Sequence, residues 1–166
     1  PARSRITAWL TRRMQEQVVF WAEAPPGARQ GNLRAWAGLA AAALSVQTGN
    51  AMLADWAEDA VSEVMCTANE DGSLPQEMSR GRLALHYQLH AIAPLVTAAA
   101  LLERQGRPAS RACDGALHRI VGFAIGDMAD GARTRKITGY EQSLFDGTSR
   151  VEPFQLAWLE PYLALT

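Results

Sequence analysis

The sequence has no surplus of positive charge. Lys and Arg together number 16, against 17 Asp and Glu, and Lys136 is the only lysine. Nucleic-acid binding depends on a clustered basic surplus, so we expect no nucleic-acid partner. The sequence also lacks an uninterrupted apolar run of about 20 residues, the length that spans a membrane. The longest apolar stretches, Ala35–Val46 and Ile92–Leu102, are therefore predicted to be buried helices, and we expect no membrane span.

Cysteine is scarce, and no cluster of side chains has the spacing of a metal site. Cys66 and Cys113 lie 47 residues apart in apolar helical contexts. We predict that both are small core residues, with a disulfide between them as the alternative. We expect no metal and no cofactor, because no group of His, Cys, Asp and Glu has the spacing of a ligand set.

No segment alternates apolar and polar residues over the length of a strand. Apolar residues instead recur at steps of three and four, and alanine is abundant, which favours closely packed helices. We predict an all-α single domain over residues 1–166, built from helical hairpins. The expected helices are Ser4–Ala24, Arg34–Gln47, Met52–Cys66, Glu77–Arg104 with a kink at Pro94, Ser110–Met128 and Phe154–Leu165.

The segment Ala129–Glu152 shows no steady period and contains several glycines. We predict a long irregular loop, and a loop of this length in a helical domain is either functional or disordered. Its charges and aromatic residues favour a loop that lines a cleft. Arg133 and Lys136 are candidates for contact with an anionic polymer, although a solvated face explains them equally well.

The densest group of polar residues runs from Arg80 to His90. Arg80 and Tyr87 are seven residues apart, nearly two helical turns, so on one helix both side chains would project from the same face toward one ligand. His86 and His90 lie beside them. The alternative is structural: a solvated Arg80, a Tyr87 at the edge of the core and a His90 satisfied within it.

Two further groups have a structural and a functional interpretation. Asn32 stands where an N-cap would, and Trp36 follows one turn later; the amide either caps free backbone N–H groups or binds a ligand carboxylate. The run Trp158–Tyr162 either packs in the core or stacks on sugar rings.

These residues carry a family resemblance. Asn32 with Trp36, the run Asp71–Met78, the run Arg80–Leu95 and the run Trp158–Tyr162 occur in the order and spacing of alginate lyases of the poly(β-D-mannuronate) lyase type. The resemblance implies part of an incomplete (α/α) toroid, the C-terminal portion, with the N-terminal half absent. It also implies that an N-terminal half or a partner chain completes the toroid, because half a toroid leaves apolar faces uncovered.

The resemblance implies β-elimination on an anionic polysaccharide of uronic acids in the periplasm. Asn32 matches an asparagine that acts at the substrate carboxylate, Arg80 matches an arginine suited to the same group by its two-donor fork, and Tyr87 matches the general acid and possible base. We expect these three to be catalytic. His86, His90, Trp36, Lys136 and Arg133 are expected to bind substrate.

The sequence departs from the family pattern at two of these positions. Leu33 stands where the family has a histidine that acts as base or neutralises the carboxylate, and leucine cannot move a proton. Gln88 stands where a histidine commonly follows the tyrosine. A catalytic lysine of the N-terminal half has no counterpart here.

The sequence thus leaves three hypotheses open. The first, on which we settle because Asn32, Arg80 and Tyr87 are retained, is a lyase that cleaves alginate, polymannuronate or a related polyuronate. The second is a degenerate relative that binds an anionic exopolysaccharide without cleaving it, and Leu33 favours this one. The third is a purely structural helical scaffold.

Overall fold

The computed structural model describes residues 2–147 and 152–166. Within these ranges the secondary structure is helical, without strands, as predicted. The elements are α1 (Ala2–Glu23), α2 (Pro26–Arg29), α3 (Asn32–Thr48), α4 (Ala51–Met65), α5 (Pro75–Met78), the 3₁₀ turn η1 (Gly81–Leu83), α6 (Ala84–Glu103), η2 (Ala109–Arg111), α7 (Ala112–Asp127), α8 (Ala132–Thr138), η3 (Pro153–Leu156) and α9 (Leu159–Leu163).

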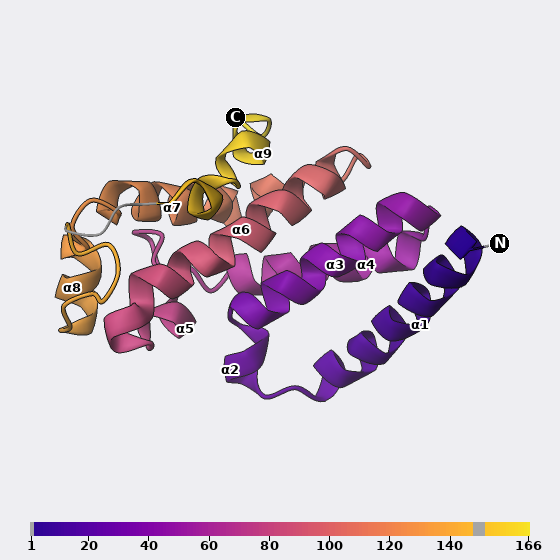
Figure 1. Cartoon of the computed structure of the whole chain (residues 1–166), viewed down its shortest axis with the longest axis horizontal. Coiled ribbons are helices and arrows are strands. Elements are labelled where there is room, and N and C mark those ends of the chain that lie inside the picture. The colour runs from indigo at the N-terminus through magenta and orange to yellow at the C-terminus, as the bar shows by residue number, and fades with distance from the viewer. Residues whose placement is uncertain (1, 148–151) are drawn as a thin grey trace.

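Helices α3, α4 and α6 form the centre of the molecule (Figure 1). Helix α1 lies along the outer side of α3, and α7 and α9 pack on α6 from the other side. Small residues let the central helices approach closely. A Cβ at Gly38 would lie 2.9 Å from Val61 Cγ1, and Ala35, Ala41 and Ala42 are fully buried. The high alanine content therefore serves close helix packing, as expected.

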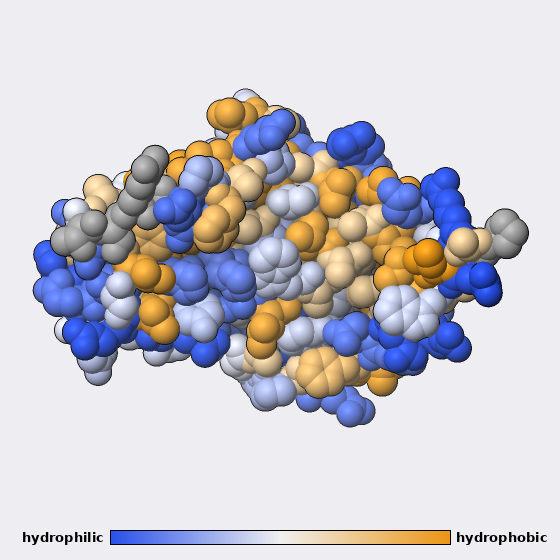
Figure 2. Space-filling model, viewed as in Figure 1, coloured by the Kyte–Doolittle hydropathy of each residue, from blue (hydrophilic) through white to orange (hydrophobic). Residues whose placement is uncertain are grey.

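Helix α6 belongs to the core. The stretch Gly81–Glu103 is long and apolar enough to resemble a membrane span by length and composition, but most of it is buried inside the protein. It packs against α3, α4 and α7. In the view of Figure 2, hydrophilic residues gather over α5 and α8 and near the N-terminal end of α1, whereas paler and apolar residues cover the middle, over α3 and α6.

The helix predicted over Glu77–Arg104 is interrupted. Helix α5 ends at Met78, and α6 begins only at Ala84. The break falls at Gly81, whose φ of +57° lies in the left-handed region that favours glycine. Beyond the break α6 continues through Pro94 to Glu103.

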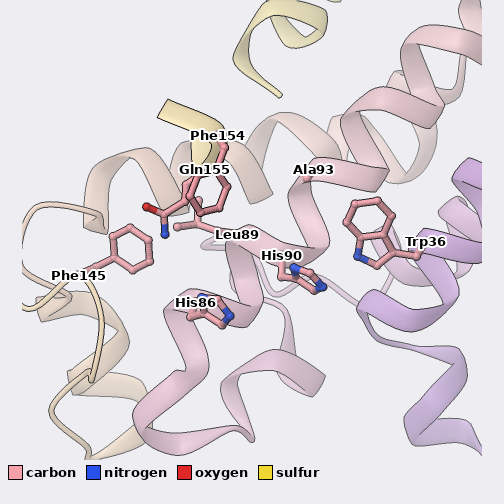
Figure 3. A pocket seen from close by; sticks show the side chains of 8 residues that line it. All are labelled: Trp36, His86, Leu89, His90, Ala93, Phe145, Phe154 and Gln155. Carbon is pink, nitrogen blue, oxygen red and sulfur yellow. The ribbon is translucent and has the colours of Figure 1, made fainter. Parts of the chain in front are cut away.

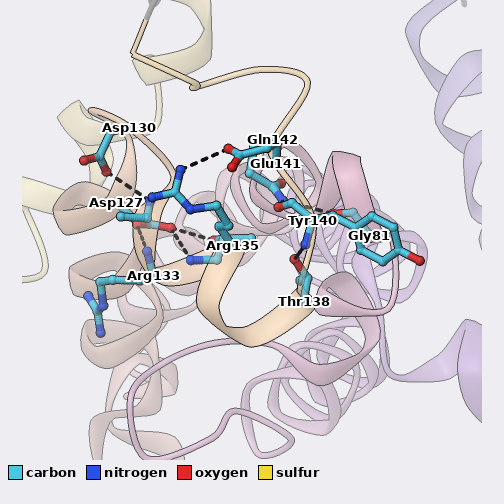
Figure 4. A network of polar contacts seen from close by, with 11 residues as sticks. Gly81, Asp127, Asp130, Arg133, Arg135, Thr138, Tyr140, Glu141 and Gln142 are labelled. Carbon is cyan, nitrogen blue, oxygen red and sulfur yellow. Dashed lines mark hydrogen bonds and ion pairs between the residues drawn. The ribbon is translucent and has the colours of Figure 1, made fainter.

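The segment Ala129–Glu152 is not irregular throughout, which corrects the sequence-based prediction. Helix α8 lies within it, between Gly131 and Gly139, which both have left-handed φ values. The buried carboxylate of Asp127 accepts hydrogen bonds from the backbone N–H of Arg133 and Thr134 and from the Thr134 hydroxyl (Figure 4). These bonds satisfy free N–H groups at the start of α8, a contribution that periodicity does not reveal.

Two smaller predictions also need correction. The segment between the first two predicted helices, for which no helix was expected, contains the one-turn helix α2. The helix predicted over Ser110–Met128 has left-handed backbone at Cys113, Asp114 and Gly115.

The run Trp158–Tyr162 packs in the core, which is the structural alternative of the prediction. Trp158 is buried in the core, and the Tyr162 hydroxyl lies 3.0 Å from His118 Nδ1.

The two cysteines form a disulfide, so the prediction of two core thiols is wrong. Cys66 follows the last residue of α4, and Cys113 lies at the start of α7 with a Cα–Cα distance of 5.4 Å. Both residues are exposed. Their apolar sequence neighbours suggested burial, but the position of each residue at a helix end turns its side chain out of the core.

Candidate functional site

Asn32 is the first residue of α3, and Gly31 occupies the N-cap position. The capping interpretation of Asn32 is therefore wrong. Its side chain donates instead, from Nδ2 to both carboxylate oxygens of Glu77 at 3.2 Å. Its backbone N–H donates to Glu77 Oε1 at 2.7 Å. Asn32 is thus buried and tied to a carboxylate that sequence reasoning had given no role.

Arg80 lies in the turn between α5 and α6 and contacts two of these site residues. Its Nε is 3.8 Å from Glu77 Oε2, and its Cζ lies 5.1 Å from the centre of the Tyr87 ring. The structure therefore brings Arg80 and Tyr87 together as predicted. The cause differs from the prediction, because the two residues do not share one helix: the left-handed turn at Gly81 folds Arg80 back over Tyr87.

Glu77 connects the group. Its side chain is completely buried, and this burial raises its pKa above the ordinary value, against the opposing effects of the hydrogen bonds from Asn32 and the charge of Arg80. The signal that could have identified it is an acidic residue three positions before Arg80. Its long-range partner Asn32, 45 residues earlier, could not be read from spacing.

An aromatic row continues from this group along α6 and across to α3. The His86 ring lies 5.3 Å from the Tyr87 ring and 6.1 Å from the nearly parallel His90 ring, between centroids. The His90 ring in turn lies 5.4 Å from Trp36. Partial burial, and to a smaller extent the neighbouring His86, lower the pKa of His90, so its imidazole favours the neutral form that can accept a proton.

This row borders a cavity of about 330 Å³. Trp36, His86 and His90 line it on one side, and Phe145, Phe154 and Gln155 line it on the other (Figure 3). Phe145 comes from the segment predicted to line a cleft, so that prediction is confirmed for this residue. Aromatic faces of this kind suit the apolar faces of sugar rings.

The segment after α8 also buttresses the turn that carries Arg80. Gln142 donates from Nε2 to the Gly81 carbonyl and accepts at Oε1 from the Leu85 N–H. The ring of Tyr140 packs against Gly81, and Figure 4 shows these residues side by side. The segment is therefore built into the site through the backbone of the turn.

The structure does not bring the predicted basic residues into the cavity. Arg133 stacks on the ring of Phe123 at 4.5 Å and donates to the carbonyls of Phe123 and Asp71. Its guanidinium stabilises the packing of α8 on α7. Lys136 is exposed on α8 and is not part of the cavity lining. Sequence did not separate either residue from a solvated face; the structure places Lys136 on such a face and Arg133 in the contact between α8 and α7.

The two departures from the family pattern differ in their consequence. Gln88 is completely buried, accepts from the Leu74 N–H at 3.0 Å and donates to the Gly72 carbonyl at 2.9 Å. It holds the loop before α5 and has no access to a ligand. Leu33 is 57% exposed and lies one turn before Trp36. An apolar side chain therefore occupies the position in which a histidine would meet substrate.

Across residues 2–147 and 152–166, no group of three or more His, Cys, Asp and Glu side chains is arranged to hold a metal ion. In the part of the chain that the structure describes, three buried donor atoms have no hydrogen-bond partner, Trp21 Nε1, Arg34 Nε and Arg34 Nη1, and all lie where Arg34 stacks on Trp21 and Trp56. These atoms belong to the packing of α1 on α3 and α4.

Comparison with known proteins gives one consistent result. The family model described as Alginate lyase matches residues 1–134. A polysaccharide lyase of Stenotrophomonas maltophilia is 31% identical over 154 residues, which are 93% of this chain and 46% of that protein. An alginate lyase of Pseudomonas syringae is 31% identical over 163 residues, 96% of this chain and 41% of that protein.

Solved structures agree with these sequence matches. Alginate lyase A1-III from Sphingomonas species A1 gives a TM-score of 0.83 at 26% identity, over 98% of this chain and 46% of that one. A variant of that enzyme complexed with a tetrasaccharide also gives 0.83 at 26% identity, over 95% and 44%. The chain thus spans less than half the length of the relatives it matches.

Proposed function

The chain belongs to the alginate lyase family, and from this premise we propose that it acts in a polysaccharide lyase that cleaves alginate, polymannuronate or a related polyuronate by β-elimination. One observation carries the proposal. Asn32 at the start of α3 meets Arg80 and Tyr87, from the distant turn before α6 and from α6 itself, through Glu77 and the Tyr87 ring, beside an aromatic cavity.

The reaction makes three chemical demands. The proton on C5 of a uronate is weakly acidic, so the substrate carboxylate must be neutralised before an enolate-like intermediate forms. A base must then take that proton, and an acid must protonate the departing C4 oxygen. Donor groups of Asn32 and Arg80 meet the first demand, and the Tyr87 hydroxyl meets the acid role.

The aromatic row gives the substrate a place to lie. Trp36 and Phe154 are exposed, and both border the cavity with His90. A sugar ring stacked there would have its carboxylate near the start of α6, where Arg80 from the preceding turn lies over the ring of Tyr87. An oligosaccharide bound along the aromatic row would thus present its carboxylate to the polar residues that carry out the proposed β-elimination.

A relative that binds polyuronate without cleaving it is the second candidate. The exposed Leu33 favours it, because this position directly follows Asn32 in the sequence and carries no titratable group. Both candidates expect binding through Arg80, so binding alone does not separate them. Only product formation does.

The experiment is an assay for the C4–C5 double bond of the product, which absorbs in the ultraviolet through conjugation with the carboxylate. The intact protein that contains this chain is mixed with polymannuronate, polyguluronate and polyglucuronate. We expect absorbance to rise with one polymer and to be lost in Tyr87→Phe, whereas Tyr162→Phe, whose hydroxyl pairs with His118 instead, keeps activity. Saturable binding without any product would favour the second candidate, and no binding would favour a structural scaffold.

We also propose a periplasmic location. The disulfide between Cys66 and Cys113 supports it, because such bonds persist in oxidising compartments and are rare in the cytosol. Fractionation of cells that express the whole protein tests this, with the disulfide measured by thiol labelling in each fraction. Recovery in the cytosol with both thiols free would contradict it.

A further N-terminal half or a partner chain completes the toroid in this proposal. Helix α1 leaves Ile6, Trp9, Val19 and Phe20 exposed, each by more than half of its surface. Apolar faces of this kind are commonly covered by another protein surface. Light scattering on the whole protein and on this chain alone would test it, and a monodisperse soluble monomer of this chain alone would count against it.

A further inference from the structure

The buried carboxylate of Glu77 contacts two of the three proposed catalytic residues, Asn32 and Arg80. We propose that Glu77 is the positioning residue of the carboxylate subsite, holding the Asn32 amide and the Arg80 guanidinium in the arrangement that receives a uronate carboxylate. This inference rests on the proposed function, and it assigns a role to a residue for which neither the sequence nor the comparisons supplied one.

The contact with Asn32 fixes which way its amide faces. Nδ2 lies 3.2 Å from both Glu77 oxygens, so the nitrogen rather than the oxygen of the amide is turned toward the carboxylate. An amide nitrogen carries two hydrogens. One is shared between the two Glu77 oxygens, and the other is left for a ligand. The backbone bond from Asn32 at 2.7 Å anchors the same carboxylate at the start of α3.

The contact with Arg80 uses one part of the guanidinium. Nε lies 3.8 Å from Glu77 Oε2, while Cζ lies over the Tyr87 ring, 5.1 Å from its centre. Contact through Nε leaves Nη1 and Nη2, which together can make the two-point contact that carboxylates accept. A single acidic group therefore directs donors from α3 and from the α5–α6 turn toward one place.

The backbone at Gly31 approaches the Glu77 carboxylate closely. A Cβ at Gly31 would lie 2.9 Å from Glu77 Oε1 and 2.9 Å from Gln76 Cγ. Gly31 has an extended φ of -122°, so glycine is required here by the close approach rather than by its backbone angle. The fully buried side chain is held by the hydrogen bonds from Asn32, and fixed placement is the property that a positioning group needs.

The test compares Glu77→Gln with Asp127→Asn in the intact protein. Both wild-type carboxylates are buried and accept backbone and side-chain hydrogen bonds, but Asp127 does so at the start of α8, outside the site. Glutamine keeps the shape of glutamate and places an NH₂ donor against the donors of Asn32 or Arg80. The readouts are the Kd for a trimannuronate by calorimetry, and the NMR signals of the Asn32 side-chain amide and the Arg80 Nε–H.

We expect Glu77→Gln to weaken trimannuronate binding at least tenfold and to shift both NMR signals. Asp127→Asn should lower the melting temperature and leave the Kd and both signals unchanged. Gly31→Ala is the second variant, because it displaces the Glu77 carboxylate without removing it. We expect it to weaken binding in the same direction, so the test stands if Glu77→Gln fails to fold.

The outcomes separate the two proposals. Normal wild-type binding with unchanged Kd and unchanged NMR signals in a folded Glu77→Gln or Gly31→Ala would overturn the role of Glu77 alone. Equal losses of binding in Glu77→Gln and Asp127→Asn would also overturn it, because general destabilisation would then explain both. Failure of the wild type to bind any polyuronate would overturn the proposed function, and the subsite with it.

Discussion

At the scale of single residues, the question is which group acts as the base, because Leu33 stands where the family has a histidine. Leu33 is exposed and directly follows Asn32 in the sequence, while His90 lies in the cavity wall next to Trp36. Burial, and to a smaller extent the neighbouring His86, lower the pKa of His90 and so favour the neutral imidazole, the form that accepts a proton. The site therefore contains a possible base on α6, although the usual position on α3 carries none.

Replacing Leu33 with histidine tests whether the site lacks a base. We expect Leu33→His to raise kcat on the preferred polyuronate at least tenfold, since a positioned base contributes about 10²–10⁴-fold. The side chain is largely in solvent, so the melting temperature should stay close to that of the wild type. Activity is measured from the absorbance of the unsaturated product.

Leu33→Asn is the matched control, because it adds polarity without a group that titrates near neutrality. A gain in both variants would mean that removal of the apolar side chain is responsible. If the wild type is active and Leu33→His does not raise kcat, His90 or Tyr87 would be indicated as the base that the site already contains.

At the scale of elements, the site depends on the loop between α4 and α5. Gly72 in this loop has a φ of +90°, and a Cβ there would lie 2.0 Å from the carbonyl oxygen of Arg119 on α7. Gln88 holds the same loop from α6 through the Gly72 carbonyl and the Leu74 N–H. The loop therefore packs on α7 and is hydrogen-bonded to α6, and these contacts determine where α5 and its residue Glu77 lie.

We expect Gly72→Ala to lower the free energy of unfolding by about 3 kcal/mol or more, because a left-handed backbone and a steric overlap with α7 act together. Gly106→Ala is the matched control. Gly106 has a similar φ of +77° and nothing within 4 Å of the added Cβ, so it should cost only about 1–2 kcal/mol.

Urea unfolding followed by circular dichroism measures both variants. Equal losses of stability at the two positions would show that the close approach of the loop to α7 is absent in solution. A larger loss of stability in Gly72→Ala would support the close packing of this loop on α7, which positions α5 relative to α6.

For the whole molecule, the disulfide fixes the arrangement of two distant parts. Cys66 and Cys113 are 47 residues apart, and their bond ties the end of α4 to the start of α7. In the sequence, α4 precedes α6 and α7 follows it. A cross-link restricts the unfolded chain more as the closed loop becomes longer.

We therefore expect reduction of the bond to lower the free energy of unfolding by about 2–4 kcal/mol. Urea titrations with and without a reductant measure it. The double variant Cys66→Ser with Cys113→Ser should match the reduced wild type and should not respond to the reductant. Identical curves for oxidised and reduced wild type would contradict the expectation.

The helical class and the principal helices follow from local sequence. Apolar spacing along Met52–Cys66 predicted α4, observed over Ala51–Met65, because periodic burial on one helix face leaves a record in the order of residues. The same holds for Arg34–Gln47, whose alanines predicted a helix buried between neighbours. Family resemblance then brought Asn32, Arg80 and Tyr87 forward as one group.

Tertiary structure decided what these residues touch. Glu77 accepts hydrogen bonds from Asn32, which lies 45 positions earlier in the sequence. Gln88, at the position where the family commonly has a histidine, donates to the loop before α5. Arg133 stacks on the ring of Phe123. Hydrogen bonds and stacking of this kind depend on the approach of distant segments, and local spacing does not encode that approach. Residue order by itself determined the helices and the candidate group, whereas the packing of α3, α5 and α6 determined which polar side chains face a ligand.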